Sequence, residues 1–315
     1  MFKDFDISFV DKNDEPLPII ILAGVNGSGK TSLLESLYNL DLLKNSYVEV
    51  HQTTKSDIVE VFKKDGIKYF NAGINEIAKV KKEFVKYWYN LVKFHNKRND
   101  EITEELQKFI KEIFGKLTIS VTYSHIDEDD NIFFKNDKDE KFKISELSTG
   151  EQTLFAKILY LFFQDYKDKV ILIDEPELSL HPSWQNSILK IYENFALKNN
   201  CQIIIATHSP HIIGAANPEY LRVLNKIEDK IEVLEYSQSY GLEFNEILTS
   251  IMGVKYLRTP IVAQKMANVK SMIVQNEYDS DEFKKEWSQL EEILGKKYLD
   301  LKLLKLEITS RRKNV

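Results

Sequence analysis

Short apolar runs alternate along this chain with longer segments whose apolar residues recur every three or four positions. The runs predict buried strands, and the longer segments predict helices with one buried face. Strands are expected at 5–10, 18–23, 170–173, 202–206, 221–224 and 230–236, and helices at 31–39, 151–163 and 183–197. The first two strands and the last two are each expected to form a hairpin. This alternation is typical of an α/β fold with a mostly parallel sheet.

Two regions depart from the alternation. Residues 45–140 predict a largely helical insertion, because helical spacing runs from 74 to 114 with a break at 95–100, and short strands follow from 117. Residues 44–70 within it fit neither pattern clearly. Everything after about 240 reads as helices. We therefore expect one domain at 1–240, interrupted by the insertion, and a helical region at 241–315.

Composition narrows the class of protein. The chain has 315 residues, 43% of them hydrophobic, and a net charge of −6, which excludes a globally basic nucleic-acid binder. No apolar run approaches the roughly 20 residues needed to cross a bilayer, and the N-terminus does not resemble a signal peptide. A single cysteine, Cys201, allows no intrachain disulfide. These features predict a cytoplasmic protein with no membrane partner.

A glycine-rich turn between a buried strand and a helix carries the clearest chemistry. The segment fits the pattern GxxxxGK[ST] and reads Gly24-Val25-Asn26-Gly27-Ser28-Gly29-Lys30-Thr31. Its backbone N–H groups and the helix dipole predict a cradle for nucleotide phosphates. Lys30 is expected to bind the β- and γ-phosphates, and Thr31 to bind Mg²⁺. The sequence therefore predicts an ATP site formed by Gly24, Asn26, Gly27, Ser28, Gly29, Lys30, Thr31 and Ser32.

Two acids end the buried strand at 170–173. Asp174 is expected to hold Mg²⁺, and Glu175 to orient and polarise the attacking water. Both follow the carboxyl end of the strand, where open α/β sheets bind ligands. By itself the pattern also fits a strand that runs into a solvated turn, but with the phosphate loop upstream we interpret it as catalytic.

The segment Leu147-Ser148-Thr149-Gly150-Glu151-Gln152 opens an apolar helix shortly before these acids. It resembles the LSGGQ signature of ABC-type ATPases, in the form carried by SMC-like ATPases and by those of the overcoming-lysogenization-defect group. The resemblance implies an ABC-type P-loop core in which Ser148, Gly150 and Glu151 address the nucleotide of the opposite subunit. Ser148 and Glu151 also fit a helix capping box, and both roles are compatible.

Two later segments extend the resemblance. DEPELSLHP, beginning at Asp174, is similar to the loop that follows the acids in compact bacterial AAA-family ATPases of this kind. His208, in THSP after a buried strand, stands where that family has a histidine that touches the γ-phosphate. The family also uses a glutamine that reaches the metal. Gln52 is the better candidate for it, because Gln107 lies on an expected helix, and the residue that stacks on adenine is left open.

What the resemblance implies for function is a homodimer, or a higher even-numbered oligomer, with two composite ATP sites. The region around Tyr240-Gly241-Leu242 is similar to the ATPase subunits of the Septu anti-phage system and to retron-associated ATPases. In those systems the ATPase associates with a nuclease on another chain. We therefore expect a regulatory ATPase that controls an effector, encoded nearby, in antiviral defence.

Rival functions stay open at this point. A DNA-clamping repair ATPase of the SMC or RecF kind would contact DNA directly, through the basic stretch 79–98 with its interspersed aromatics. The same stretch also fits an amphipathic helix with a solvated lysine face. A transporter cassette would need a membrane subunit, and a P-loop kinase would leave Ser148 and His208 without a role.

Overall fold

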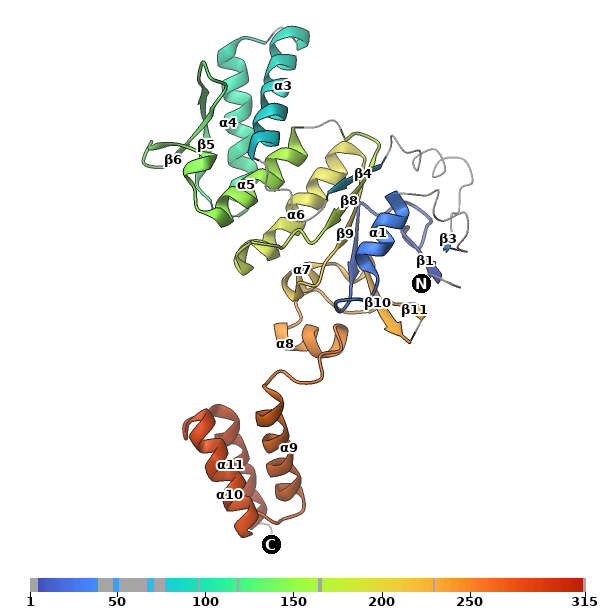
Figure 1. Cartoon of the computed structure of the whole chain (residues 1–315), viewed down its shortest axis with the longest axis vertical. Helices are drawn as coiled ribbons and strands as arrows, with labels where there is room; N and C mark the ends of the chain where they lie inside the picture. Colours follow the sequence, from blue (N-terminus) through green and yellow to red (C-terminus); the bar gives the residue numbers. More distant parts are fainter. Residues whose placement is uncertain are drawn as a thin grey trace. The chain divides into compact units, whose positions relative to one another are not determined.

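The computed structural model describes residues 5–38, 48–50, 67–70, 77–95, 97–117, 119–163, 166–228 and 230–313. The chain forms two compact units, Met1–Ile247 and Leu248–Val315. Figure 1 shows the elements of each. Among the described residues, no helix combines the length and the hydropathy that a membrane span requires.

A six-stranded sheet forms the centre of the first unit. Its strand order is β11-β10-β2-β9-β8-β4, and only the β10–β11 pair is antiparallel. The strands are β2 (Ile19–Ala23), β4 (Ile67–Phe70), β8 (Val170–Asp174), β9 (Gln202–Ala206), β10 (Leu221–Ile227) and β11 (Lys230–Leu234). The runs IIILA and VILID are buried at every position, as expected of strands covered on both faces. The predicted α/β fold with a mostly parallel sheet is confirmed.

Register brings the carboxyl ends of three strands to one edge of this sheet. Asp174 at the end of β8 pairs with Ala206 at the end of β9, and Ala206 pairs with Leu22 near the end of β2. Helix α1 (Lys30–Tyr38) follows β2, and its leucines at 33, 34 and 37 are buried in the same core as β8 and β9. The loops after these three strands therefore open side by side.

The N-terminal hairpin expected from the sequence is only partly present. Val10 and Pro16 form one antiparallel bridge around the turn, but β1 (Phe5–Ile7) pairs in parallel with β3 (Val48–Val50). The hairpin of β10 and β11 is confirmed. The insertion expected at 45–140 needs one correction. Residues 67–70 within it form strand β4, which pairs with β8 in the main sheet.

The rest of the expected insertion is a helical hairpin followed by a small sheet. Helices α3 (Ile77–His95) and α4 (Asn99–Gly115) run side by side (Figure 1), and β5 (Val121–Ile126), β6 (Ile132–Asn136) and β7 (Lys141–Lys143) form an antiparallel sheet. The hairpin contacts α5 (Thr149–Phe162) through aromatic rings, with the centroids of Phe109 and Phe162 5.2 Å apart. A 3₁₀ turn at Ile144–Glu146 leads into α5.

The remaining elements of the first unit are short, apart from α6 (Pro182–Asn199). They are α7 (Pro210–Ala215), a 3₁₀ turn at Pro218–Tyr220 and α8 (Phe244–Glu246). A π-helical turn at Ile247–Ile251 leads out of the unit.

Three helices make up the second unit, namely α9 (Pro260–Val274), α10 (Asp281–Leu294) and α11 (Leu299–Lys313). They enclose a core of their own, in which Val269, Leu290 and Leu301 are fully buried. The sequence predicted helices throughout this region.

Candidate functional site

The glycine-rich turn forms an open backbone nest at the end of β2. Gly24, Gly27 and Gly29 have φ values of 143°, 80° and 95°, which L-residues with side chains rarely adopt. A Cβ at Gly24 would lie 2.5 Å from the carbonyl oxygen of Leu224, so that position admits only glycine. The three glycines therefore give the loop a backbone conformation that the predicted phosphate cradle requires.

Ser28 and Lys30 sit buried within this nest. The Ser28 hydroxyl has no hydrogen-bond partner in the described part of the chain. The Lys30 ammonium donates to the carbonyl oxygens of Gly24 (2.8 Å) and Val25 (3.1 Å), so it is folded over its own loop. Burial lowers the pKa of Lys30, against the raising effect of the nearby acids Glu175, Glu177 and Asp174. A buried cation and an unsatisfied hydroxyl are polar groups that an anion such as phosphate can satisfy.

The two acids after β8 differ in their surroundings. Asp174 is 5% exposed and lies within the ladder beside Ala206. Glu175 is half-buried, and its backbone takes the left-handed conformation with φ at 47° while its N–H donates to the Ala206 carbonyl at 2.8 Å. The turn at Glu175 therefore ends the strand and directs this carboxylate out of the sheet.

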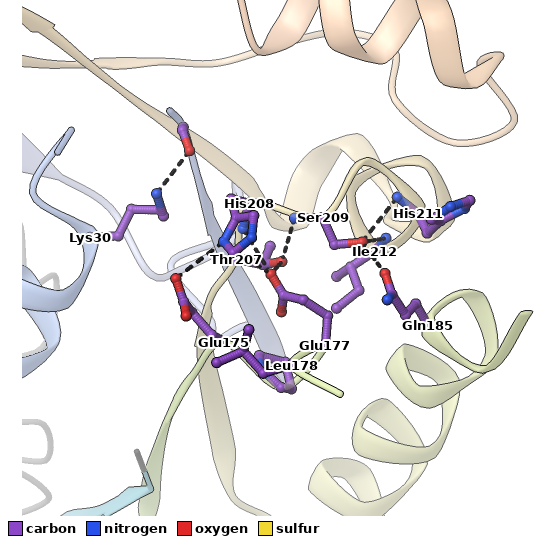
Figure 2. A network of polar contacts seen from close by, with 12 residues as sticks. Lys30, Glu175, Glu177, Leu178, Gln185, Thr207, His208, Ser209, His211 and Ile212 are labelled. Carbon is purple, nitrogen blue, oxygen red and sulfur yellow. Dashed lines mark hydrogen bonds and ion pairs between the residues drawn. The ribbon is translucent and has the colours of Figure 1, made fainter. Parts of the chain in front are cut away.

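His208 meets the carboxylate of Glu175 from the neighbouring loop after β9 (Figure 2). Its Nδ1 lies 3.1 Å from Glu175 Oε1 and 3.6 Å from Glu177 Oε1. His208 thus contacts Glu175 directly, and Lys30 lies near enough for the Glu175 charge to act on its pKa. The three residues were predicted from separate motifs.

Glu177 anchors that loop, a role the sequence analysis missed. This buried carboxylate accepts hydrogen bonds from the Thr207 hydroxyl (2.6 Å) and the His208 backbone N–H (3.0 Å). Ser209 caps α7 by accepting from two backbone N–H groups, and its hydroxyl donates to Gln185 of α6 at 2.6 Å. Buried polar side chains beside a motif are the signal that could have pointed to Glu177, but only contacts show which loop it holds.

The signature segment has a different environment. Ser148 is the N-cap of α5 and forms a reciprocal capping box with Glu151, as the structural alternative predicted. A Cβ at Gly150 would lie 3.4 Å from the Ser179 carbonyl oxygen and 3.9 Å from the ring of Trp184. Gly150 therefore lies beside the loop after Glu175 and beside α6.

Lys157, two turns further along α5, holds the same loop. Its ammonium donates to the carbonyl oxygens of Pro176 (2.9 Å) and Leu178 (3.0 Å). Burial lowers the pKa of Lys157 to about 8, against the raising effect of Glu177 and Glu175. Helix α5 and the loop that follows Glu175 are thereby fixed to each other.

Thr31 and Asp174 offer oxygen ligands of the kind that Mg²⁺ prefers. Thr31 is exposed at the first turn of α1, next to Lys30, whose pKa responds to the Asp174 charge. Within the described ranges, no group of three or more His, Cys, Asp or Glu residues could hold a metal ion by itself. The donor set fits an ion that is shared with nucleotide phosphates. Gln52, the other predicted ligand, lies outside the described residues.

Comparisons with known proteins agree with this geometry. A family model described as "AAA domain, putative AbiEii toxin, Type IV TA system" matches residues 51–214, slightly more than half of the chain. Septu protein PtuA of Bacillus thuringiensis is 27% identical over 66% of this chain and 56% of its own length. The retron Vc95 probable ATPase of Vibrio cholerae is 29% identical over 47% of this chain and 29% of its own length.

The chain thus spans about half the length of the first relative and less of the second. Among solved structures, the SMC head domain from Thermotoga maritima aligns with a TM-score of 0.45 and 14% identity, over 75% of this chain and 95% of that one. The resemblance to Septu and retron-associated ATPases that was stated from the sequence is confirmed by these matches.

Proposed function

The chain belongs to this AAA-domain family, and on that premise we propose that it hydrolyses ATP in composite sites shared between two copies. The observation that carries the proposal is the network of Figure 2, in which a P-loop lysine, a strand-end glutamate and a histidine converge. Such a set can bind a triphosphate and orient water beside its terminal phosphate.

Each side chain has a distinct task in this scheme. The nest from Gly24 to Thr31 binds the phosphates, and Lys30 turns from its own carbonyls toward them, because a phosphate oxygen is a stronger acceptor than a neutral carbonyl. Glu175 accepts a hydrogen bond from the attacking water and polarises it. His208 is positioned beside Glu175 to contact the γ-phosphate. Mg²⁺, held by Thr31 and Asp174, neutralises phosphate charge when it is bound.

The second half of each site is proposed to come from another copy. Ser148 and Gly150 stand at the N-terminus of α5, where backbone N–H groups and the helix dipole favour an anion. Within its own chain Gly150 lies beside the Ser179 carbonyl and Trp184. In this proposal, the nucleotide that Ser148 and Gly150 address belongs to a facing copy. Lys157 joins α5 to the loop after Glu175, so binding of a nucleotide by α5 at one site is coupled to the acids of the other site.

Native mass measurement of Glu175→Gln with and without ATP tests this directly. This variant should bind ATP without hydrolysing it, and so accumulate an even-numbered assembly that the nucleotide-free protein lacks. Lys30→Ala is the matched control, because loss of the lysine should prevent both binding and assembly. A Glu175→Gln protein that binds ATP yet stays monomeric would contradict the composite site and favour the kinase alternative.

The proposed output is control of a partner effector, a nuclease, in defence against phage. Support comes from the names of the relatives, a Septu protein and a retron ATPase. Glu175→Gln purified with its neighbouring genes intact should carry a second polypeptide in an ATP-dependent stoichiometry. If the assembly forms but carries no second polypeptide in either state, the ATPase proposal stands and the effector proposal is lost.

Direct DNA clamping is the alternative, and the structure bears on it. Helix α3 exposes Tyr89 and Phe94 with the Lys93 ammonium over both rings, a combination suited to nucleic acid. However, Lys81 donates to the Asp129 carbonyl and to Asn131, so this lysine is engaged within the chain. Steeply salt-dependent, ATP-dependent DNA binding that Lys82→Glu weakens would favour the clamp.

A further inference from the structure

Helix α11 of the second unit has two apolar faces. Leu301 and Leu304 are 0% and 7% exposed and belong to the three-helix core. Leu299, Leu303 and Leu306 are 66%, 55% and 67% exposed. One buried face satisfies a helix at the surface of a bundle, so the core does not account for the second leucine set.

These exposed leucines form a continuous stripe. Their spacings of four and then three residues are those of a coiled-coil seam. At 100° per residue, Leu299, Leu303 and Leu306 fall within about 60° of one another and lie opposite Leu301 and Leu304. The stripe therefore has the geometry to pack against another helix and points away from its own bundle.

The charges that flank the stripe have opposite signs on its two edges. Lys302 lies on one edge and is exposed. Asp300 and Glu307 lie on the other edge, where Asp300 contacts Arg258 and Glu307 pairs with Arg311 at 2.9 Å. In a parallel pair of helices, a residue on one edge of the seam lies opposite a residue on the other edge of the partner helix. The partner residue is five positions later in the sequence.

We propose that the α11 stripe, defined as Leu299, Leu303 and Leu306, pairs in parallel and in register with the same stripe of a second copy. Lys302 then faces Glu307 of the partner subunit on both sides of the seam. An antiparallel pair would instead set lysine against lysine and acid against acid, which is unfavourable. The charge pattern thus selects both the occupant and its direction.

This contact is separate from the nucleotide interface and does not require the proposed ATPase function. A seam of three leucines per helix spans about two turns, so alone it gives a weak, concentration-dependent dimer. If ATP also joins the two cores, the tails become neighbours and the same seam closes at a much higher effective concentration. The α11 contact in the second unit would then hold two copies together after ATP hydrolysis separates their first units.

Sedimentation of the full chain without nucleotide, from about 1 to 300 μM, tests the contact. The wild type should show a monomer–dimer equilibrium, and Leu306→Glu should weaken it at least about tenfold. Ile261→Glu is the matched control, because Ile261 is 70% exposed on α9 of the same unit but lies outside the stripe, and it should dimerise as the wild type does. Lys302→Glu and Glu307→Lys should each weaken dimerisation, and the double variant should restore it.

Direction is tested by an introduced thiol. Ser310 continues the stripe by one further step of four residues, so parallel pairing brings Ser310→Cys against its own copy and an oxidant should link the two chains. The linked species should form without nucleotide. A wild type that stays monomeric throughout, a dimer insensitive to Leu306→Glu, or a double charge variant that is no better than the singles would overturn the proposal, as would docking of the stripe on the chain's own first unit.

Discussion

The phosphate-loop end and the signature end of the first unit are both built on helix N-termini, but different side chains surround the two helix ends. At the phosphate loop, α1 begins with Lys30, and Glu175 and His208 come from the loops after β8 and β9. At the signature, the described neighbours of the α5 N-terminus are its own capping box, the Ser179 carbonyl and the ring of Trp184 on α6. Local sequence thus suffices to form both capped helix ends, but within the described part of the chain the predicted catalytic residues lie together at the phosphate-loop end.

The largest effects should come from variants that disable one of the two helix ends and leave the other intact. Lys30→Ala should reduce ATP affinity at least about 100-fold, because the charge inside the nest is lost. Ser148→Arg should leave ATP affinity within about threefold while reducing turnover at least about 100-fold, because it blocks only the facing copy. Equilibrium binding of a fluorescent ATP analogue and steady-state phosphate release measure the two quantities.

A mixture of these two variants sharpens the comparison. A mixed dimer has one site with both defects and one site with neither, so activity absent from each variant should reappear at about a quarter of wild type for random pairing. If mixing restores nothing, the two ends do not act on one nucleotide, and the comparison drawn above fails.

Glu177→Ala should have a smaller effect, on both stability and rate. It removes the acceptor of the Thr207 hydroxyl and the His208 N–H, leaving two buried donors unsatisfied at a cost of about 3 kcal/mol in unfolding free energy. Turnover should fall about tenfold because His208 is no longer held beside Glu175. Glu177→Gln, which keeps an acceptor oxygen, should recover most of the stability in denaturant unfolding. Equal losses in both variants would show that the charge, and not the acceptor, holds the loop.

Lys157→Met should give the smallest effect, visible mainly through pH. Because burial lowers the pKa of Lys157 to about 8 from 10.5, the folded chain binds fewer protons than the unfolded chain between these values. The unfolding free energy of the wild type should therefore rise, relative to Lys157→Met, by about 2 kcal/mol from pH 8 to 10.5. A difference that stays flat, or falls, over this window would mean that Lys157 is not buried as a cation.

Local pattern was enough to predict the main sheet and the phosphate loop. IIILA and VILID are buried at every position, and glycines in the spacing of the loop leave few alternative conformations. Strand β4 was not predictable in the same way, since its place depends on pairing with β8, about a hundred residues later. The hydrophobic pattern of residues 44–70 does not predict that long-range pairing.

The same division holds within the site. Lys30, Glu175 and His208 follow from motifs, because their chemistry depends on neighbours in sequence. Glu177 and Lys157 do not, since each acts on a loop from a distance set by the fold. Gln52 stays a prediction.

The backbone of Glu175 carries one more consequence. A left-handed residue with a side chain costs about 1 kcal/mol more than glycine would at the same place. A chain optimised for thermal endurance alone would put glycine or asparagine there and tolerate more heat. If Glu175 has the proposed catalytic role, the glutamate at this position is a compromise between thermal stability and reactivity, and its positive φ is the structural sign of that compromise.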